Sequence, residues 1–235
     1  MTESPSLSSP RVLAVGPFVE SCSRLRRLHP EYPRVYAVAA VAEEGRRRWW
    51  QLADGARNGR IDLMYSRAAA EMPTAQRAAD VVSMSLIHAV VGRVVALLVL
   101  EGRAWDPGLE NLWVHNDNDG GIDWAGVADT TLRVLPDDRQ AGSEGTVVLP
   151  CEEALVVWIA HRCVTALSEI ADRLEACPGF DRERLWGMVG EAVSGASTYV
   201  PILARTSEKV GARRGQAVID VLATSGHPVR RKGVA

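Results

Sequence analysis

The hydrophobic pattern is strongest in the C-terminal half of the chain. Between about residues 152 and 176, apolar side chains recur at steps of three and four, as on one face of a helix. They are Val156, Ile159, Cys163, Leu167, Ile170 and Leu174. Cys177-Pro178-Gly179 ends this helix, and Asp181 is a suitable N-cap for the next one. The second apolar face comprises Leu185, Val189, Ala192, Ala196, Tyr199 and Leu203. The sequence therefore predicts a long helical hairpin over residues 151–205.

The middle of the chain holds another long apolar stretch. Residues 75–91 have a helical pattern, and Thr74 can cap that helix. Residues 94–100 are almost all apolar, so periodicity alone does not separate a helix from a buried strand; we favour a helix. The Ala-rich residues 35–53 are also predicted as a helix, as are 18–28 and 212–224.

Residues 105–149 have a different composition. Two runs rich in apolar and aromatic residues, 111–115 and 121–125, flank an Asn-Asp-Asn-Asp-Gly turn, which predicts a β-hairpin. Short strands are expected at 130–135 and 145–149. The predicted fold class is mostly α (α+β), a helical domain with one small antiparallel sheet. We expect residues 1–10 to be disordered, 11–226 to form one domain with this insert, and 227–235 to be a basic tail.

The composition of the chain limits the classes of function that it can have. The 235 residues carry a net charge of −2 and are 47% hydrophobic, as in a soluble globular protein. The basic run Arg46-Arg47-Arg48 before Trp49-Trp50 is of a kind that binds phosphate or nucleic acid, but more often forms a solvated face. No apolar leader precedes the first helix, and the apolar run 86–100 is shorter than a membrane span. We predict a cytoplasmic protein without nucleic-acid partner or membrane span.

No familiar catalytic motif is present, so the candidate site rests on residue types. Arg93 lies in an apolar stretch and needs a partner, either a structural carboxylate such as Glu101 or Asp123, or an anionic ligand. Aromatic walls with a few His and Arg groups are typical of small-molecule sites. We predict a cavity formed by His88, Arg93, Trp113, Trp158, His161 and Trp186. The alternative is that each of these is a core residue with its own partner.

The cysteines do not predict a metal cluster. None of the four forms a C-x-x-C pair, and Cys151 and Cys163 are separated by roughly 18 Å along one helix. Cys163 lies on the apolar face and is predicted to be a core residue. Asp117, Asp119 and Asp123 lack the spacing of an EF-hand loop. We therefore predict no metal site and no intrinsic cofactor, in particular no [2Fe–2S] cluster.

Small residues recur along one side of the second hairpin helix. Gly187, Gly190 and Ser194 are spaced by three and four, and each glycine costs roughly 1 kcal/mol of helix propensity. Such a pattern permits the close approach of a neighbouring helix or of a ligand. We favour the helix.

Several segments, in this order along the chain, resemble the FhuF-like ferric-siderophore reductases. They are Gly16-Pro17-Phe18, the long helix through His88 to Leu100 with Gly102 after it, the Trp-containing hairpin, and Arg184-Leu185-Trp186-Gly187. The family's C-terminal cysteines, which hold a [2Fe–2S] cluster, are not matched: Arg230-Arg231-Lys232 and the chain end stand there. The resemblance implies a ferric siderophore or related chelating metabolite as ligand, and an external electron donor for any reduction.

The function expected from the sequence is thus a FhuF-like protein of iron or siderophore metabolism without its own cluster. Two alternatives remain open. The scaffold could serve a tailoring enzyme of natural-product biosynthesis, or a non-catalytic binding or scaffold protein.

Overall fold

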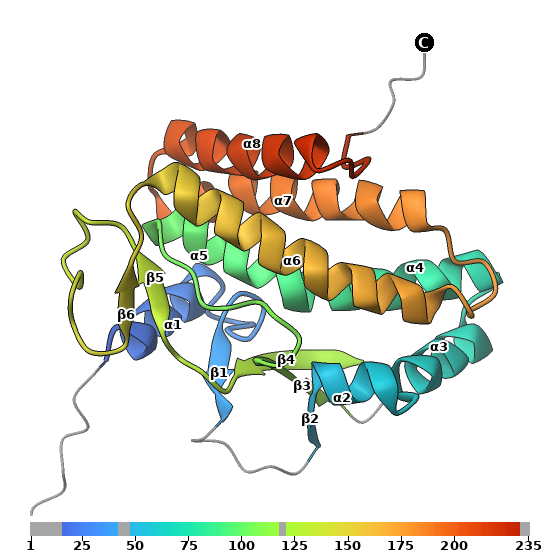
Figure 1. Ribbon diagram of the computed structural model, residues 1–235. Coiled ribbons are helices and arrows are strands. Elements are labelled where there is room, and N and C mark those ends of the chain that lie inside the picture. Colours follow the sequence, from blue (N-terminus) through green and yellow to red (C-terminus); the bar gives the residue numbers. More distant parts are fainter. Residues whose placement is uncertain (1–15, 42–47, 118–120, 231–235) are drawn as a thin grey trace, which may run out of the picture.

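The computed structural model describes residues 16–41, 48–117 and 121–230 and consists mainly of helices (Figure 1). The helices are α1 (Pro17–Leu28), α2 (Leu52–Arg57), α3 (Arg60–Glu71), α4 (Ala75–Ile87), the π-turn η2 (His88–Gly92), α5 (Arg93–Glu101), α6 (Glu152–Leu174), α7 (Arg182–Ala204) and α8 (Glu208–Thr224). The strands are β1 (Val38–Ala40), β2 (Trp49–Gln51), β3 (Leu112–Asn116), β4 (Ile122–Val127), β5 (Leu132–Val134) and β6 (Thr146–Val148). The predicted fold class, mostly α with some β, is confirmed.

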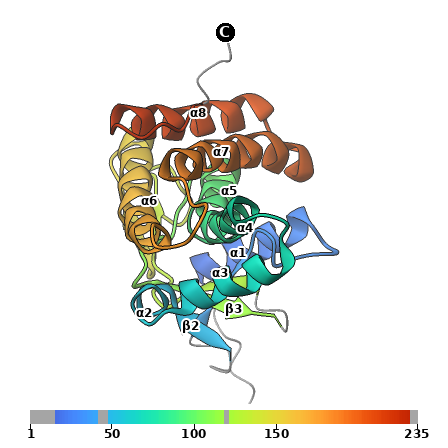
Figure 2. The ribbon, with the colours of Figure 1, turned by 90° about the vertical axis from the view of Figure 1, so that its right-hand side faces the viewer.

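The helices form stacked layers over a small sheet. α8 lies on α7, the next layer holds α6 and the α4–η2–α5 helix, and the sheet lies beneath them (Figure 2). The two predicted hairpin helices, α6 and α7, are joined by a short turn, and Asp181 caps α7 by accepting from the backbone N–H of Arg184 at 3.1 Å. Both arms contact α8 and η2, so these two elements link the hairpin to the core.

The central helix is continuous from α4 through η2 to α5, which decides the choice between helix and strand in favour of the helix. Every residue from Arg93 to Val99 is buried, because α1, α7, α8 and η2 all contact α5. Within the described part of the chain, two helices are long and apolar enough to cross a membrane: Ala75–Glu101 has 27 residues, and Glu152–Leu174 has 23. The most apolar window of the first is 78% buried, as expected of a core helix. A cytoplasmic location remains a prediction.

The strands depart in detail from the predicted single antiparallel sheet. The larger sheet has the order β1-β4-β3-β2 and is mixed, because β1 runs parallel to β4 while the other pairs are antiparallel. The predicted hairpin is β3–β4, with a bulge between His115 and Asn116. β5 and β6 form a separate parallel pair.

The prediction of a helix over residues 35–53 is wrong for the described part of that segment, which contains β1 and β2. Val38 faces the main core, whereas Ala39 and Trp49 pack in a second cluster with Trp113 and Trp124. Both faces of these strands are therefore occupied, and pairing with β3 and β4 overrides the helix propensity of the alanines. Residues 42–47 lie outside the described part of the chain, as do 1–15, 118–120 and 231–235.

A buried ion-pair network joins α1 and the end of α5 to the loop before β6. Arg103 is 3% exposed and donates two hydrogen bonds to Asp138, at 2.6 and 2.8 Å. It also donates to Ser21 Oγ at 3.0 Å and to Glu101 at 3.3 Å. Glu101 in addition accepts from Arg24 at 2.8 Å. The predicted pairing of Glu101 with Arg93 is thus wrong, because Glu101 belongs to this network.

Cys163 is buried against η2, as the sequence predicts. Its Sγ lies 4.0 Å from the carbonyl oxygen of Val90, and burial raises the pKa of the thiol well above its usual value. We expect Cys163→Ala to lower the free energy of unfolding by only about 1 kcal/mol, since a small residue replaces a small one. Alkylation of the native protein, followed by mass spectrometry, should label the exposed Cys151 and spare Cys163. Equal labelling of both thiols would contradict this prediction.

Candidate functional site

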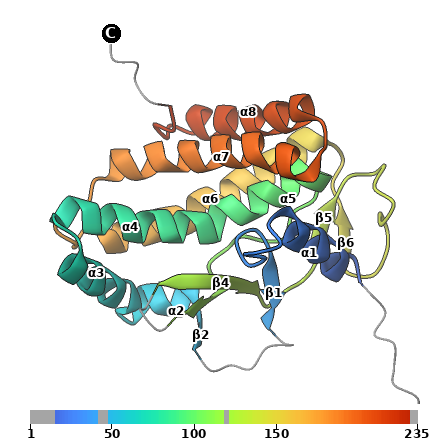
Figure 3. The same ribbon diagram turned by 180° about the vertical axis from the view of Figure 1, so that it is seen from behind.

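A cavity of about 580 Å³ opens beside the middle of the central helix. One wall is residues 31–35, here called the strap, which follows α1 and lies next to α5 (Figure 3). The other walls come from His88 of η2, Arg93 of α5, and Ile122 and Asp123 of β4. The volume falls in the usual range for small-molecule sites, roughly 300–1,000 Å³. We call this the strap cavity.

Arg93 is the most unusual residue of the strap cavity. Its side chain is 2% exposed, and its Nη2 donates to the carbonyl oxygen of Arg34 at 3.2 Å. Its Nε and Nη1 atoms have no hydrogen-bond partner among the described residues. Burial lowers the pKa of Arg93 to about 10, while the charge of Asp123 acts in the opposite direction. The guanidinium therefore stays charged at neutral pH with two donors unmet, which is costly in a buried position.

His88 holds the strap against the helix. Its Nε2 lies 2.7 Å from the carbonyl oxygen of Val35. Because a carbonyl only accepts, Nε2 carries the proton and Nδ1 is the unprotonated nitrogen. A Cβ atom at position 92 would lie 2.5 Å from that Nδ1, so Gly92 is required for the ring to pack here. His88 therefore acts as a neutral tether, with its free nitrogen turned to the backbone of η2.

The π-turn gives the central helix its local irregularity at this point. The five residues of η2, His88–Gly92, have π-helical geometry and lie between two regular α-helical segments. Such π-turns are frequent at functional sites. His88 is the first residue of this turn and Arg93 directly follows it, and both reach the strap: His88 at Val35 and Arg93 at Arg34.

Asp123 connects the strap to the outer face of the sheet. It accepts from Arg34 at 3.0 Å and from Nδ1 of His115 at 2.7 Å. Arg34 also lies over the ring of Trp124, 4.5 Å from its centroid. Asp123 influences Arg93 through its charge, but the two described side chains do not form an ion pair with each other. Of the two carboxylates predicted for Arg93, Asp123 is thus the neighbour, and it is already engaged by Arg34 and His115.

Burial, followed by the neighbouring charge of Arg93, lowers the pKa of His88 from 6.5 to about 4. Above pH 6.5 the ring is neutral in both the folded and the unfolded chain. As the pH falls from 6.5 to about 4, the unfolded chain takes up the proton first, so stability is lost over this window. Between about pH 7 and pH 4.5, the parent should lose about 2 kcal/mol more unfolding free energy than His88→Gln.

Glutamine is the appropriate replacement for this test because it keeps a donor for Val35 and does not titrate. Urea unfolding of both proteins at the two pH values gives the comparison, and the contributions of all other acidic groups cancel. An equal loss in both proteins would show that His88 takes up its proton in the folded state.

The structure brings His88 and Arg93 together and separates the other four predicted site residues. Trp113 lies on the outer face of the sheet, packed with Trp49 and Trp124. Trp158 is covered by Arg133 of β5, whose guanidinium lies 4.6 Å from the ring centroid. The predicted six-residue cavity is therefore wrong as a single site, because β3 and α6 turn their tryptophans toward other partners.

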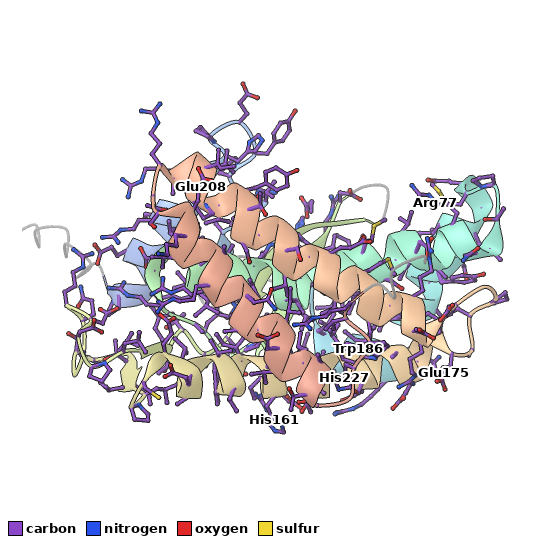
Figure 4. All side chains as sticks on the ribbon, turned by 90° about the horizontal axis from the view of Figure 1, so that it is seen from above. Arg77, His161, Glu175, Trp186, Glu208 and His227 are labelled. Atoms are coloured by element: carbon purple, nitrogen blue, oxygen red, sulfur yellow. The ribbon has the colours of Figure 1, made fainter. Side chains whose placement is uncertain are left out.

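His161 and Trp186 are also far from the strap cavity. His161 is exposed on α6 and points outward, whereas Trp186 is buried and stacks on His227 with 3.9 Å between ring centroids (Figure 4). The segment after α8 covers this side of α7: a Cβ at position 190 would lie 1.9 Å from the carbonyl oxygen of Val229. Gly190 thus accommodates a backbone segment, neither the helix nor the ligand that its spacing suggested.

The strap itself was not predicted from the sequence. Arg34 lies between Pro33 and Val35, just before the segment 35–53 that was predicted as a helix, and nothing in the hydrophobic pattern marks it. The signal that was available is the pair Pro30 and Pro33, which disfavour a helix there. Among the described residues, no three His, Cys, Asp or Glu side chains form a group that could hold a metal ion.

Comparison with known proteins gave no match: no family model matches the chain, and no curated protein or solved structure matches it significantly. The resemblance to FhuF-like reductases remains a sequence-based expectation.

Proposed function

We propose that this protein binds a small anionic metabolite in the strap cavity, with Arg93 as the group that recognises its negative charge. The observation that carries the proposal is the guanidinium of Arg93, a residue that lines the 580 Å³ cavity and whose buried Nε and Nη1 have no partner among the described residues. A carboxylate, catecholate or phosphate oxygen that accepted from these atoms would relieve the cost of burying them. The apolar part of such a ligand would lie against Ile122 and Pro33.

The ligand class suggested by the sequence resemblance is a ferric siderophore or related chelating metabolite. Its anionic members, those with catecholate or carboxylate groups, match the chemistry of Arg93 better than neutral hydroxamates do. Any reduction of the iron would use an external electron donor, and this part of the proposal rests on the resemblance alone.

The contacts in the strap cavity favour binding over catalysis. His88 donates through Nε2 to Val35, and its Nδ1 packs against Gly92, so it is poorly placed to take a proton from a ligand. Asp123 is held by Arg34 and His115. Of the titratable side chains that line the cavity with Arg93, His88 and Asp123 are thus engaged in holding its walls.

Isothermal titration calorimetry with defined chelates tests the proposal. The probes are a ferric tricatecholate, ferric citrate, a ferric trihydroxamate and the three chelators without iron. We expect the anionic chelates to bind the parent and the neutral trihydroxamate to bind at least tenfold more weakly. His161→Ala serves as the control variant because His161 is exposed on α6, away from the cavity, and should bind as the parent does. Absence of binding by every probe would overturn the siderophore assignment.

A further inference from the structure

A second cavity lies between α3 and the end of β3, and basic side chains dominate its lining. It has a volume of about 280 Å³ and is lined by Arg48, Arg60, Arg67 and Trp50, with Asp117 as its one carboxylate among the lining residues. It shares no lining residue with the strap cavity. Three arginines line this cavity, against Arg34 and Arg93 in the strap cavity.

The arrangement of two of these arginines follows from helix geometry. Arg60, Met64 and Arg67 are spaced by four and three residues on α3, so they share one face of the helix. The two arginines start roughly 10 Å apart along the axis and both line the cavity, with Met64 between them. The guanidinium of Arg60 lies 5.8 Å from the centroid of the Trp50 ring, which fixes one side of the site.

Arg60 and Arg67 make no ion pair with any described residue. Neighbouring charged residues are paired. Arg57 forms an ion pair with Glu169 at 4.0 Å, and the nearby carboxylate of Asp62 forms an ion pair with Arg173. No ion pair among the described residues therefore compensates Arg60 and Arg67, and Asp117 is the one carboxylate among the residues that line the cavity with them. Two adjacent cations raise the local affinity for an anion with more than one charge.

A second, more apolar hollow of about 170 Å³ continues the cavity along α3 toward α4. The two hollows share Met64, Arg67 and Asp117, and the second also includes Val82 and Ala68. Together they form a groove with a cationic end at Arg60 and Arg67 and a mainly apolar end against α4, where Glu71 is the one carboxylate besides Asp117 among the lining residues. The groove fits an elongated ligand with an anionic head and an apolar body.

We propose that this groove binds an organic phosphate, with the phosphate group between Arg60 and Arg67 and the apolar part lying past Met64 toward α4. A phosphate monoester carries nearly two negative charges at neutral pH and three acceptor oxygens, so two guanidinium groups share it well. A carboxylate has a single charge and two oxygens, and leaves one arginine uncompensated.

Calorimetric titration with phenyl phosphate at low salt is the test, with inorganic phosphate and benzoate as reference ligands. Phenyl phosphate should bind more tightly than either reference, because only it has both the dianionic head and the apolar body. Arg60→Gln and Arg67→Gln should each weaken its binding about tenfold or more. Arg57→Gln is the matched control, since Arg57 is a nearby exposed arginine outside the groove, and should bind as the parent does.

The titration is repeated in an Arg93→Met background, which removes the recognising group of the strap cavity. Unchanged phenyl phosphate affinity in that background would locate the binding in the groove, independently of the function proposed above. Equal weakening by Arg57→Gln and Arg60→Gln would mean a diffuse charge effect and would overturn the site. Binding that is lost with Arg93→Met and kept in both groove variants would overturn it as well.

Discussion

Replacement of Arg93 by methionine is expected to weaken the binding of anionic ligands by roughly a hundredfold while leaving the protein at least as stable as the parent. The loss of binding and the retained stability have different causes. Binding is lost because the ligand's acceptor atoms would face an apolar side chain. Stability is kept or raised because a buried cation with unmet Nε and Nη1 donors is removed, and methionine fills a similar volume.

The two quantities are measured separately, by calorimetric titration of the ligand that binds the parent and by urea unfolding without ligand. Arg93→Lys is the informative companion, since it keeps a charge but supplies a different donor geometry; we expect intermediate affinity. A loss of several kcal/mol of unfolding free energy in Arg93→Met would show that Arg93 mainly supports the fold, through Arg34 or the charge of Asp123. The main argument for ligand binding in the strap cavity would then fail.

The largest effect on stability is expected at Arg103. Arg103→Met leaves the buried carboxylates of Asp138 and Glu101 without their strongest donor, and should lower the free energy of unfolding by about 3–5 kcal/mol. Glu101 keeps its contact with Arg24, whereas Asp138 loses its bidentate partner, so most of the cost arises at Asp138. Urea unfolding at neutral pH gives the value.

Arg182→Met is the control for this prediction. Arg182 also binds two carboxylates, Asp172 and Glu175, but all three groups lie at the surface, and its loss should cost less than about 1 kcal/mol. The contrast tests burial as the cause, since the residue type and the number of carboxylate partners are the same. Similar losses in the two variants would mean that the Arg103 network is well solvated and would contradict the prediction.

The candidate site was only partly predictable. The sequence identified Arg93 as a candidate site residue because a charge in a long apolar stretch needs a partner. This inference uses only the residues that adjoin Arg93 in the chain. The prediction also grouped Trp113, Trp158, His161 and Trp186 with Arg93, since aromatic and His residues are typical of small-molecule sites. Which of these face one another depends on how helices and strands are rotated in the fold, and residue type contains no information on that.

What the sequence by itself determined is the helical framework: the long helices α6 and α7 follow from periodicity, and the cap at Asp181 follows from a side chain that accepts from the backbone N–H three residues further on. The tertiary structure decided where Val38 and Trp49 belong. Their segment has helix-forming alanines, yet β1 and β2 form because partners distant in the sequence, β4 and β3, complete their hydrogen bonds. The tertiary structure also decided the position of the strap, since Val35 and Arg34 are held by His88 and Arg93, which are more than 50 residues away in the sequence. Local spacing encodes a helix, but contacts of this range exist only once the chain has folded.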